Sequence, residues 1–258
     1  MGIYNSFLGK KRILQFMANH PASRVALPNR ILNIGRRWGF LYIRIFGYPP
    51  VVSSRLLARK ILCFLKKKER GLLLDVGCSL GTYSFELARL GFTVVGIDVN
   101  RESINLAEKI QVLLGIKNVT FWEMNILSNN FPEHTFKVII ALETLEHIKE
   151  DSKAIQEFNR ILKNDGFLII SVPFREKVEE YDEPRGACRA KNGSLICVGE
   201  GGGHFRNGYN LRRMKTLLEN NGFRIIDYEY ICIPRLLNAS ILSFPFKYPL
   251  SLFFSPLS

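Results

Sequence analysis

The sequence predicts an α/β fold of the Rossmann-like kind, a doubly wound, mostly parallel sheet of six or seven strands with helices on both faces. From Leu72 onward, short apolar runs alternate with segments of helical spacing. A glycine-rich turn from Gly77 to Gly81 joins a buried strand to a helix. The next strand ends at Asp98, 21 residues after Gly77. Folds of this kind place a carboxylate for ribose hydroxyls roughly 20 residues after such a turn.

Each element has a local signal of its own. We expect strands near residues 72–76, 93–97, 119–123, 136–141 and 166–172, and helices near 82–90, 101–114 and 152–163. Asn100 and Gly115 are the start and stop signals of the second of these helices. A further helix should run from Asn210 to Asn221 and lead through Gly222 into a sixth strand. Before the sheet, residues 53–68 predict an amphipathic helix that packs on it.

The glycine turn D-V-G-C-S-L-G fits neither a dinucleotide fingerprint nor a phosphate loop. Ser79 stands where the fingerprint needs a second glycine, and no Gly-Lys-Ser/Thr follows. Asp75 would repel a pyrophosphate, but it suits a cationic group such as the amino group of a methionine moiety. Gly77 and Gly81 let a ligand approach the backbone closely. The alternative is a strand–turn–helix corner that binds nothing.

Successive motifs carry a resemblance to a known family. In order they are D-V-G-C-S-L-G, V-V-G-I-D-V-N, V-T-F-W-E-M-N-I with F-P-E-H-T-F-K-V-I-I, A-L-E-T-L-E-H-I, and G-F-L-I-I-S-V-P. Together they make the stretch from Leu72 to Pro173 resemble the class I S-adenosylmethionine-dependent methyltransferases, closest to the small-molecule type. The resemblance implies S-adenosyl-L-methionine as the methyl donor.

The resemblance also implies a set of donor-binding residues: Asp75, Gly77, Cys78, Gly81, Asp98, Val99, Asn125, Ile126 and Leu142. Asp98 occupies the ribose-binding place. The family usually has Asp where Asn125 stands, and the amide keeps an acceptor oxygen for the adenine amino group. It usually has Asp where Lys137 stands, and we interpret Lys137 as a solvated strand end. Cys78 is interpreted as a small turn residue near the ligand, not as a nucleophile.

Two histidines are the candidate catalytic residues. A sulfonium methyl group is already a strong electrophile, so the protein must mainly align the acceptor and exclude water. His147, after the fourth strand, is the first candidate for a general base or for acceptor positioning, and Glu143 either bonds to it or lines the donor pocket. His204, after the polar insertion 175–203, is the second. The alternative for His147 is a local capping or hydrogen-bonding role, and the alternative for His204 is a surface-loop histidine. No cluster in the sequence has metal-ligand spacing, so no metal is predicted.

Charge and composition divide the chain into three regions. Its net charge is +13, and residues 1–70 hold 15 Lys or Arg and one acid, whereas residues 71–258 sum to −1. Residues 1–70 form a basic N-terminal helical extension with three possible roles. It would bind an anionic membrane surface as partner, be cleaved off as a targeting segment, or cover the substrate mouth. Residues 71–233 form the donor-binding domain. The apolar tail 234–258 is interrupted by prolines and would cover the core, mediate dimerisation or dip into a bilayer interface, and no seventh strand is identifiable in it.

The function expected from the sequence is methyl transfer to a small-molecule acceptor that is lipid-linked, quinone-like or a glycan. Five scattered cysteines without C-x-x-C indicate a reducing, cytoplasmic location, with peripheral membrane attachment through the extension and the tail. One alternative is a methyltransferase acting on RNA or another macromolecule. The basic extension favours it, but A-L-E-T replaces the N-P-P-Y-type segment of base methylation, so nucleic acid is the less favoured partner. A non-enzymatic membrane adapter with the same fold is the other alternative.

Overall fold

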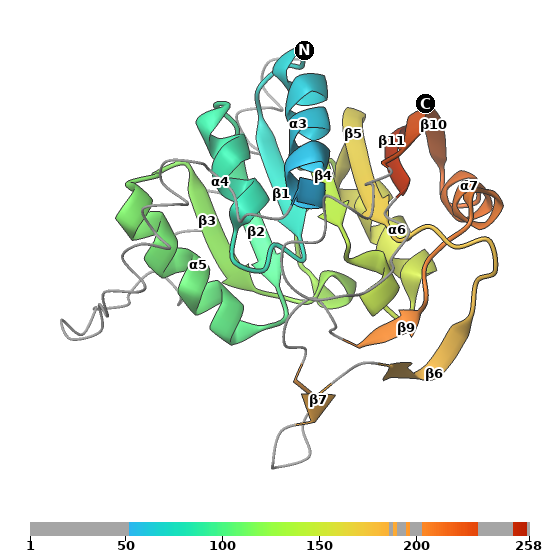
Figure 1. Ribbon diagram of the computed structural model, residues 1–258. Helices are drawn as coiled ribbons and strands as arrows, with labels where there is room; N and C mark the ends of the chain where they lie inside the picture. Colours follow the sequence, from blue (N-terminus) through green and yellow to red (C-terminus); the bar gives the residue numbers. More distant parts are fainter. Residues whose placement is uncertain (1–51, 186–187, 190–194, 197–202, 232–249, 257–258) are drawn as a thin grey trace. The chain divides into compact units, whose positions relative to one another are not determined.

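The structure is a computed structural model that describes residues 52–185, 188–189, 195–196, 203–231 and 250–256 (Figure 1). All of them belong to the second of two compact units into which the chain divides, Phe46–Ser258. Residues 1–51, most of the predicted tail and parts of the polar insertion lie outside the described residues. The predictions made for those segments therefore stay predictions.

Seven strands form one sheet in the order β10-β11-β5-β4-β1-β2-β3. Five neighbouring strands, β5, β4, β1, β2 and β3, pair in parallel. Strand β11 runs antiparallel to both of its neighbours, β10 and β5. The bounds are β1 Leu72–Val76, β2 Thr93–Asp98, β3 Val119–Glu123, β4 Phe136–Leu142, β5 Leu162–Val172, β10 Phe223–Tyr230 and β11 Leu250–Pro256. This arrangement confirms the predicted fold class.

Helices cover both faces of the sheet (Figure 1). They are α3 Val52–Lys66, α4 Thr82–Arg89, α5 Arg101–Leu114, α6 Asp151–Ile161 and α7 Leu211–Glu219. Helices α4 and α5 connect β1 to β2 and β2 to β3, so the chain moves along the sheet in one direction from β1. Helix α6 connects β4 to β5, and there the chain moves in the opposite direction. Because parallel crossovers are right-handed, α6 lies on the opposite face from α4 and α5. The predicted signals of α5 are confirmed, since the Asn100 side chain accepts a hydrogen bond from the Ser103 N–H and Gly115 ends the helix at a φ of 66°.

Helix α3 packs on the sheet through one apolar face, as its spacing predicts. Leu57, Ile61 and Leu65 are buried. The ring of Phe64 lies edge-on to that of Phe167 in β5, with 5.6 Å between centroids. The guanidinium of Arg70 donates to backbone carbonyls at the end of this helix and to that of Leu90. Part of the basic charge between residues 52 and 70 therefore has a structural role.

The seventh strand lies in the segment predicted to be an apolar tail. In β11, Leu250–Phe254 pair with Val172–Leu168 of β5, and the other edge of the strand pairs with β10. Prolines at 249 and 256 bound this short run, so its sequence looks like an interrupted tail and not like a strand.

The interpretation of Lys137 as a solvated strand end is wrong. Its ammonium lies 2.5 Å from the Asp165 carboxylate and 3.3 Å from that of Glu69, and the side chain is only 13% exposed. Asp165 lies in β5 and Glu69 lies in the segment before β1, so their approach to Lys137 depends on the tertiary fold.

Short elements extend from the sheet. Two 3-10 turns, η2 Ile126–Ser128 and η3 Leu145–His147, follow β3 and β4. Strand β6 Glu180–Arg185 pairs antiparallel with β9 His204–Arg206, and β7 Cys188–Arg189 pairs with β8 Leu195–Ile196. Among the described helices, none combines the length and the apolar run that crossing a bilayer requires.

Candidate active site

The carboxyl ends of the central parallel strands meet at one edge of the sheet. Val76 at the end of β1 pairs with Ile97 of β2 and with Ala141 of β4, and Leu142 pairs with Ser171 of β5. Loops that follow these strands carry most of the site residues predicted from the sequence. In open α/β sheets this edge is where ligands bind.

The glycine turn needs glycine at both of its ends. Gly77 has a φ of 71°, and a Cβ there would lie 2.5 Å from the Oγ1 of Thr144. Gly81 has a φ of 77°, and a Cβ there would lie 2.5 Å from the ring of Phe121. The Thr144 hydroxyl itself lies within donating distance of the Val76 carbonyl, at 3.0 Å. The turn is therefore packed tightly between the strands and the segment that follows β4.

Most N–H groups of this turn are bonded inside the protein. The N–H groups of Gly77 and Cys78 donate to the Ile97 carbonyl at 2.8 and 3.0 Å, and that of Ser79 donates to the Asp98 carboxylate at 2.9 Å. The turn therefore leaves few of these N–H groups for a ligand. What the edge offers instead is apolar surface, because Leu80 is 39% exposed and Val99 is 65% exposed.

Asp98 is held in a fixed orientation at the end of β2. Its Oδ2 accepts the hydrogen bond from Ser79, and its Oδ1 accepts one from the Asn100 N–H at 2.8 Å. The side chain is partly exposed. Each carboxylate oxygen has a second lone pair, so Asp98 can still accept hydrogen bonds from a pair of vicinal hydroxyls.

Asp75 lies behind the turn and is almost fully buried, with 2% of the residue exposed. The hydroxyl of Ser84 in α4 donates to its Oδ2 at 2.5 Å. Burial raises the pKa of Asp75 to about 7, the Ser84 bond lowers it in part, and the nearby Asp98 charge raises it further. A cation bound at the turn would favour the ionised form of Asp75 through space.

Cys78 is also buried, at 7% exposure. Burial raises the pKa of its thiol well above the usual value, and Asp75 and Asp98 raise it further. It therefore stays a neutral thiol, in line with its interpretation as a turn residue.

The predicted adenine-side residues sit around the turn that follows β3. The side-chain oxygen of Asn125 accepts a hydrogen bond from the Leu127 N–H at 2.9 Å and so begins η2, and Asn125 itself is exposed. Ile126 and Leu142 are buried at 4% and 8% exposure. Contacts of these two residues with a ligand would therefore involve mainly their backbone.

The structure brings the two candidate histidines together although 57 positions separate them in the sequence. The rings of His147 in η3 and His204 in β9 are 4.4 Å apart between centroids and nearly perpendicular. The Nδ1 of His147 lies 3.2 Å from the Gly203 carbonyl oxygen. Burial, together with the charges of His147 and Arg175, lowers the pKa of His204 to about 4. His204 is thus a neutral imidazole in a half-buried strand and not a surface-loop residue.

Two glutamates flank His147 in the sequence. Glu143, with a φ of 52°, accepts a hydrogen bond from the Ser171 hydroxyl at 2.7 Å. The residue as a whole is solvent-exposed, yet burial of its carboxyl raises the pKa of that group to about 7, and the Ser171 bond lowers it in part. Glu146 is 1% exposed, and burial followed by the Glu143 charge raises its pKa well above the usual value. Sequence analysis did not identify Glu146 as a site residue.

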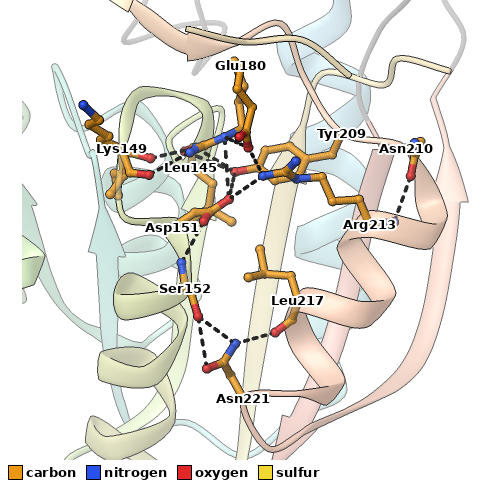
Figure 2. A network of polar contacts seen from close by, with 12 residues as sticks. Leu145, Lys149, Asp151, Ser152, Glu180, Tyr209, Asn210, Arg213, Leu217 and Asn221 are labelled. Carbon is orange, nitrogen blue, oxygen red and sulfur yellow. Dashed lines mark hydrogen bonds and ion pairs between the residues drawn. The ribbon is translucent and has the colours of Figure 1, made fainter. Parts of the chain in front are cut away.

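Arg206 fastens β9 to the turn that carries His147. It is 3% exposed, and its guanidinium donates to the carbonyls of Leu145, Ile148 and Lys149 at 2.7–2.8 Å. Figure 2 shows the surrounding network, in which the Tyr209 hydroxyl donates to Asp151 at 3.0 Å. This arginine was not predicted from the sequence, because contacts between a side chain and backbone carbonyls leave no motif.

Comparisons with known proteins agree with this architecture. Residues 67–222 match the profile of a family described as "Methyltransferase domain". Over 119 residues the chain is 34% identical to the ubiquinone biosynthesis O-methyltransferase of Actinobacillus pleuropneumoniae serotype 5b, covering 43% of this chain and 50% of the relative. Over 133 residues it is 30% identical to phosphoethanolamine N-methyltransferase 3 of Arabidopsis thaliana, covering 50% of this chain and 27% of the relative. The chain thus spans half or less of the length of these curated relatives.

Solved structures show the same fold at low sequence identity. A SAM-dependent methyltransferase from Aquifex aeolicus has a TM-score of 0.53 and 20% identity, covering 81% of this chain and all of the other. The 1,6-didemethyltoxoflavin-N1-methyltransferase of Burkholderia thailandensis, solved with 1,6-didemethyltoxoflavin and S-adenosylhomocysteine, has a TM-score of 0.57 and 16% identity, covering 91% and 94%. At these identities the similarity concerns the fold alone.

Proposed function

Because this chain belongs to the methyltransferase domain family, of the class I S-adenosylmethionine-dependent type, we propose that it transfers a methyl group from S-adenosylmethionine to a small-molecule acceptor. The observation that carries the proposal is the Asp98 carboxylate. It is oriented by Ser79 and Asn100 at the ligand-binding edge of the sheet, beside an exposed valine.

In this proposal Asp98 accepts hydrogen bonds from the two ribose hydroxyls of the donor. The adenine covers the exposed side chain of Val99, and the amide of Asn125 lies at its edge. The methionine part runs along the turn between Gly77 and Gly81. The Asp75 charge behind the turn favours the donor's ammonium and sulfonium groups through space.

The acceptor lies on the side of the turn where β4 ends. His147 and His204 follow this edge and face each other, so we assign them to positioning the acceptor. An acceptor amine needs no base when it is unprotonated. For an acceptor hydroxyl, a neutral imidazole nearby can take the proton as the oxygen forms its bond to the methyl carbon.

We propose an acceptor of amphiphilic character. The two curated relatives above are named for O-methylation in ubiquinone biosynthesis and for N-methylation of phosphoethanolamine, so the relatives' names include both oxygen and nitrogen acceptors. The excess of basic residues in positions 1–70 favours attraction to an anionic membrane surface on which such an acceptor would be found.

Calorimetric titration with S-adenosylhomocysteine tests the donor site directly. We expect Asp98→Ala to weaken binding by about 10–100-fold, the worth of hydrogen bonds to a charged group. Asp98→Asn keeps one acceptor oxygen, at the loss of one of the two backbone hydrogen bonds, and should weaken binding less. Asp227→Ala, which removes an exposed carboxylate from β10, is the control. Undiminished binding in both Asp98 variants would reject the proposed site.

A further inference from the structure

We propose that Glu146, His147 and His204 form a binding site for a divalent first-row transition metal ion, with Zn²⁺ as the best match. One ligand atom from each of these side chains lies within 4.8 Å of the other two. Two imidazoles and one carboxylate are a ligand set that zinc uses in sites with an open coordination position. A small side-chain adjustment would bring the three atoms to zinc-binding distances of about 2.0–2.2 Å.

An unsatisfied buried oxygen is the second observation that points to a cation. The Oε2 of Glu146 is buried and has no hydrogen-bond partner among the described residues. A buried carboxylate oxygen without a partner is costly, and a coordinated metal ion is one of the few ways to satisfy it. The neighbouring Glu143 adds negative charge, which a metal ion would offset.

His147 has the tautomer that metal binding requires. A carbonyl oxygen can only accept, so the contact of His147 Nδ1 with the Gly203 carbonyl places the proton on Nδ1. The lone pair of the neutral ring is then on Nε2. Metal-bound histidines commonly donate their other N–H to a backbone carbonyl in this way, which fixes the ring orientation.

Rigid elements hold the three ligands. Glu146 and His147 lie on η3, and His204 lies on β9. Arg206 lies on the same strand as His204. Its guanidinium donates to the carbonyl of Leu145 in η3 and to those of the two residues that follow η3, so it fixes the two elements against each other. A preorganised ligand set of this kind is what distinguishes a metal site from a chance cluster.

The position of the site indicates the class of acceptor, an inference that rests on the proposed function. The turn η3 begins directly after Thr144, whose side chain fills the space beside Gly77. The metal would therefore lie next to the donor turn. Three protein ligands leave a coordination position for an acceptor hydroxyl, whose pKa the metal would lower. Because both imidazoles would then be metal ligands, the oxygen would lose its proton to water instead of to a histidine. It would bond to the methyl carbon, while the carbon–sulfur electron pair returns to sulfur.

Zinc binding to the metal-free protein tests the proposal without reference to activity. After chelation, equilibrium dialysis against Zn²⁺ with elemental analysis should give one ion per chain. Glu146→Gln and His204→Ala should each weaken zinc binding by at least about tenfold, since second-shell changes alone cost about 10–100-fold. His134→Ala, at an exposed histidine outside the cluster, should bind zinc like the unmodified chain. Glu146→Gln should fold, because the replaced oxygen has no partner to lose.

The outcomes separate the metal site from the proposed function. No zinc at micromolar concentrations, or equal affinity in the Glu146→Gln and His204→Ala variants, would overturn the metal site. S-adenosylhomocysteine should still bind to the chelated protein, because the donor residues lie outside the cluster. Zinc bound through the cluster without any binding of the nucleoside would support the metal site and reject the proposed function.

Discussion

Replacing Gly77 by Ala tests whether the donor turn is built around its contact with Thr144. At the φ of 71° found there, the new Cβ would lie 2.5 Å from Oγ1 and 2.7 Å from Cγ2 of Thr144. Gly115 offers a matched control. Its φ is 66°, and a Cβ there would have nothing within 4 Å. Gly115→Ala thus imposes the same left-handed conformation without the clash.

The two glycine variants should differ by a measurable free energy of unfolding. An alanine in the left-handed region costs roughly 1–2 kcal/mol, which is the whole effect expected for Gly115→Ala. In Gly77→Ala, Thr144 must also move and lose its bond to the Val76 carbonyl, which adds about 1–2 kcal/mol. We therefore expect a total near 3 kcal/mol for Gly77→Ala.

A double-mutant cycle with Thr144→Ala isolates the contact. That change removes Oγ1 and Cγ2 and leaves only the Thr144 Cβ, 3.2 Å from the new methyl group. The cost of Gly77→Ala, measured by urea denaturation, should then fall to the value found for Gly115→Ala. Equal costs for the two glycines in the unmodified chain, or no relief in the Thr144→Ala background, would refute the reasoning.

Three further predictions concern charge. The pKa of Asp75 is about 7 in the folded state against 3.8 for the free group, so the folded state binds more protons than the unfolded state between these pH values. The free energy of unfolding should therefore fall by up to ~4 kcal/mol as the pH rises from 4 to 7. Urea denaturation across this range should show a flatter profile for Asp75→Asn, and an unchanged slope would count against the assignment. Arg206→Lys keeps the charge but places all donors on one nitrogen, which cannot reach the carbonyls that two guanidinium nitrogens contact, so it should cost about 2–4 kcal/mol. Lys at the exposed Arg212 should cost almost nothing, and similar losses at the two positions would contradict the role of Arg206 in holding η3. The full chain should sediment with anionic phospholipid vesicles and detach as NaCl rises, and equal binding to neutral vesicles would exclude the proposed surface attraction.

The fold was largely predictable because its signals are local. The bounds of β1, β3 and α5 agree with the predicted ranges, and β2 and β4 differ by one residue. Their apolar runs are continuous because helices bury both faces of the strands. Strand β11 was not predictable, since its partner β5 is distant in sequence and prolines bound its short run.

The site was predictable where it depends on the backbone. The glycine turn and the position of Asp98 follow from strand length and turn geometry, which the sequence encodes locally. The meeting of His147 with His204 does not, because it requires β9 to lie on η3 through Arg206. Spacing along the chain therefore indicated no metal ligands, while the fold places three candidates within 4.8 Å.

A crystal structure of the chain with S-adenosylhomocysteine tests the central claim most directly. The account predicts the two ribose hydroxyls within hydrogen-bond distance of the Asp98 carboxylate, and the adenine over Val99. A nucleoside bound elsewhere, or one whose ribose lies away from Asp98, would contradict it.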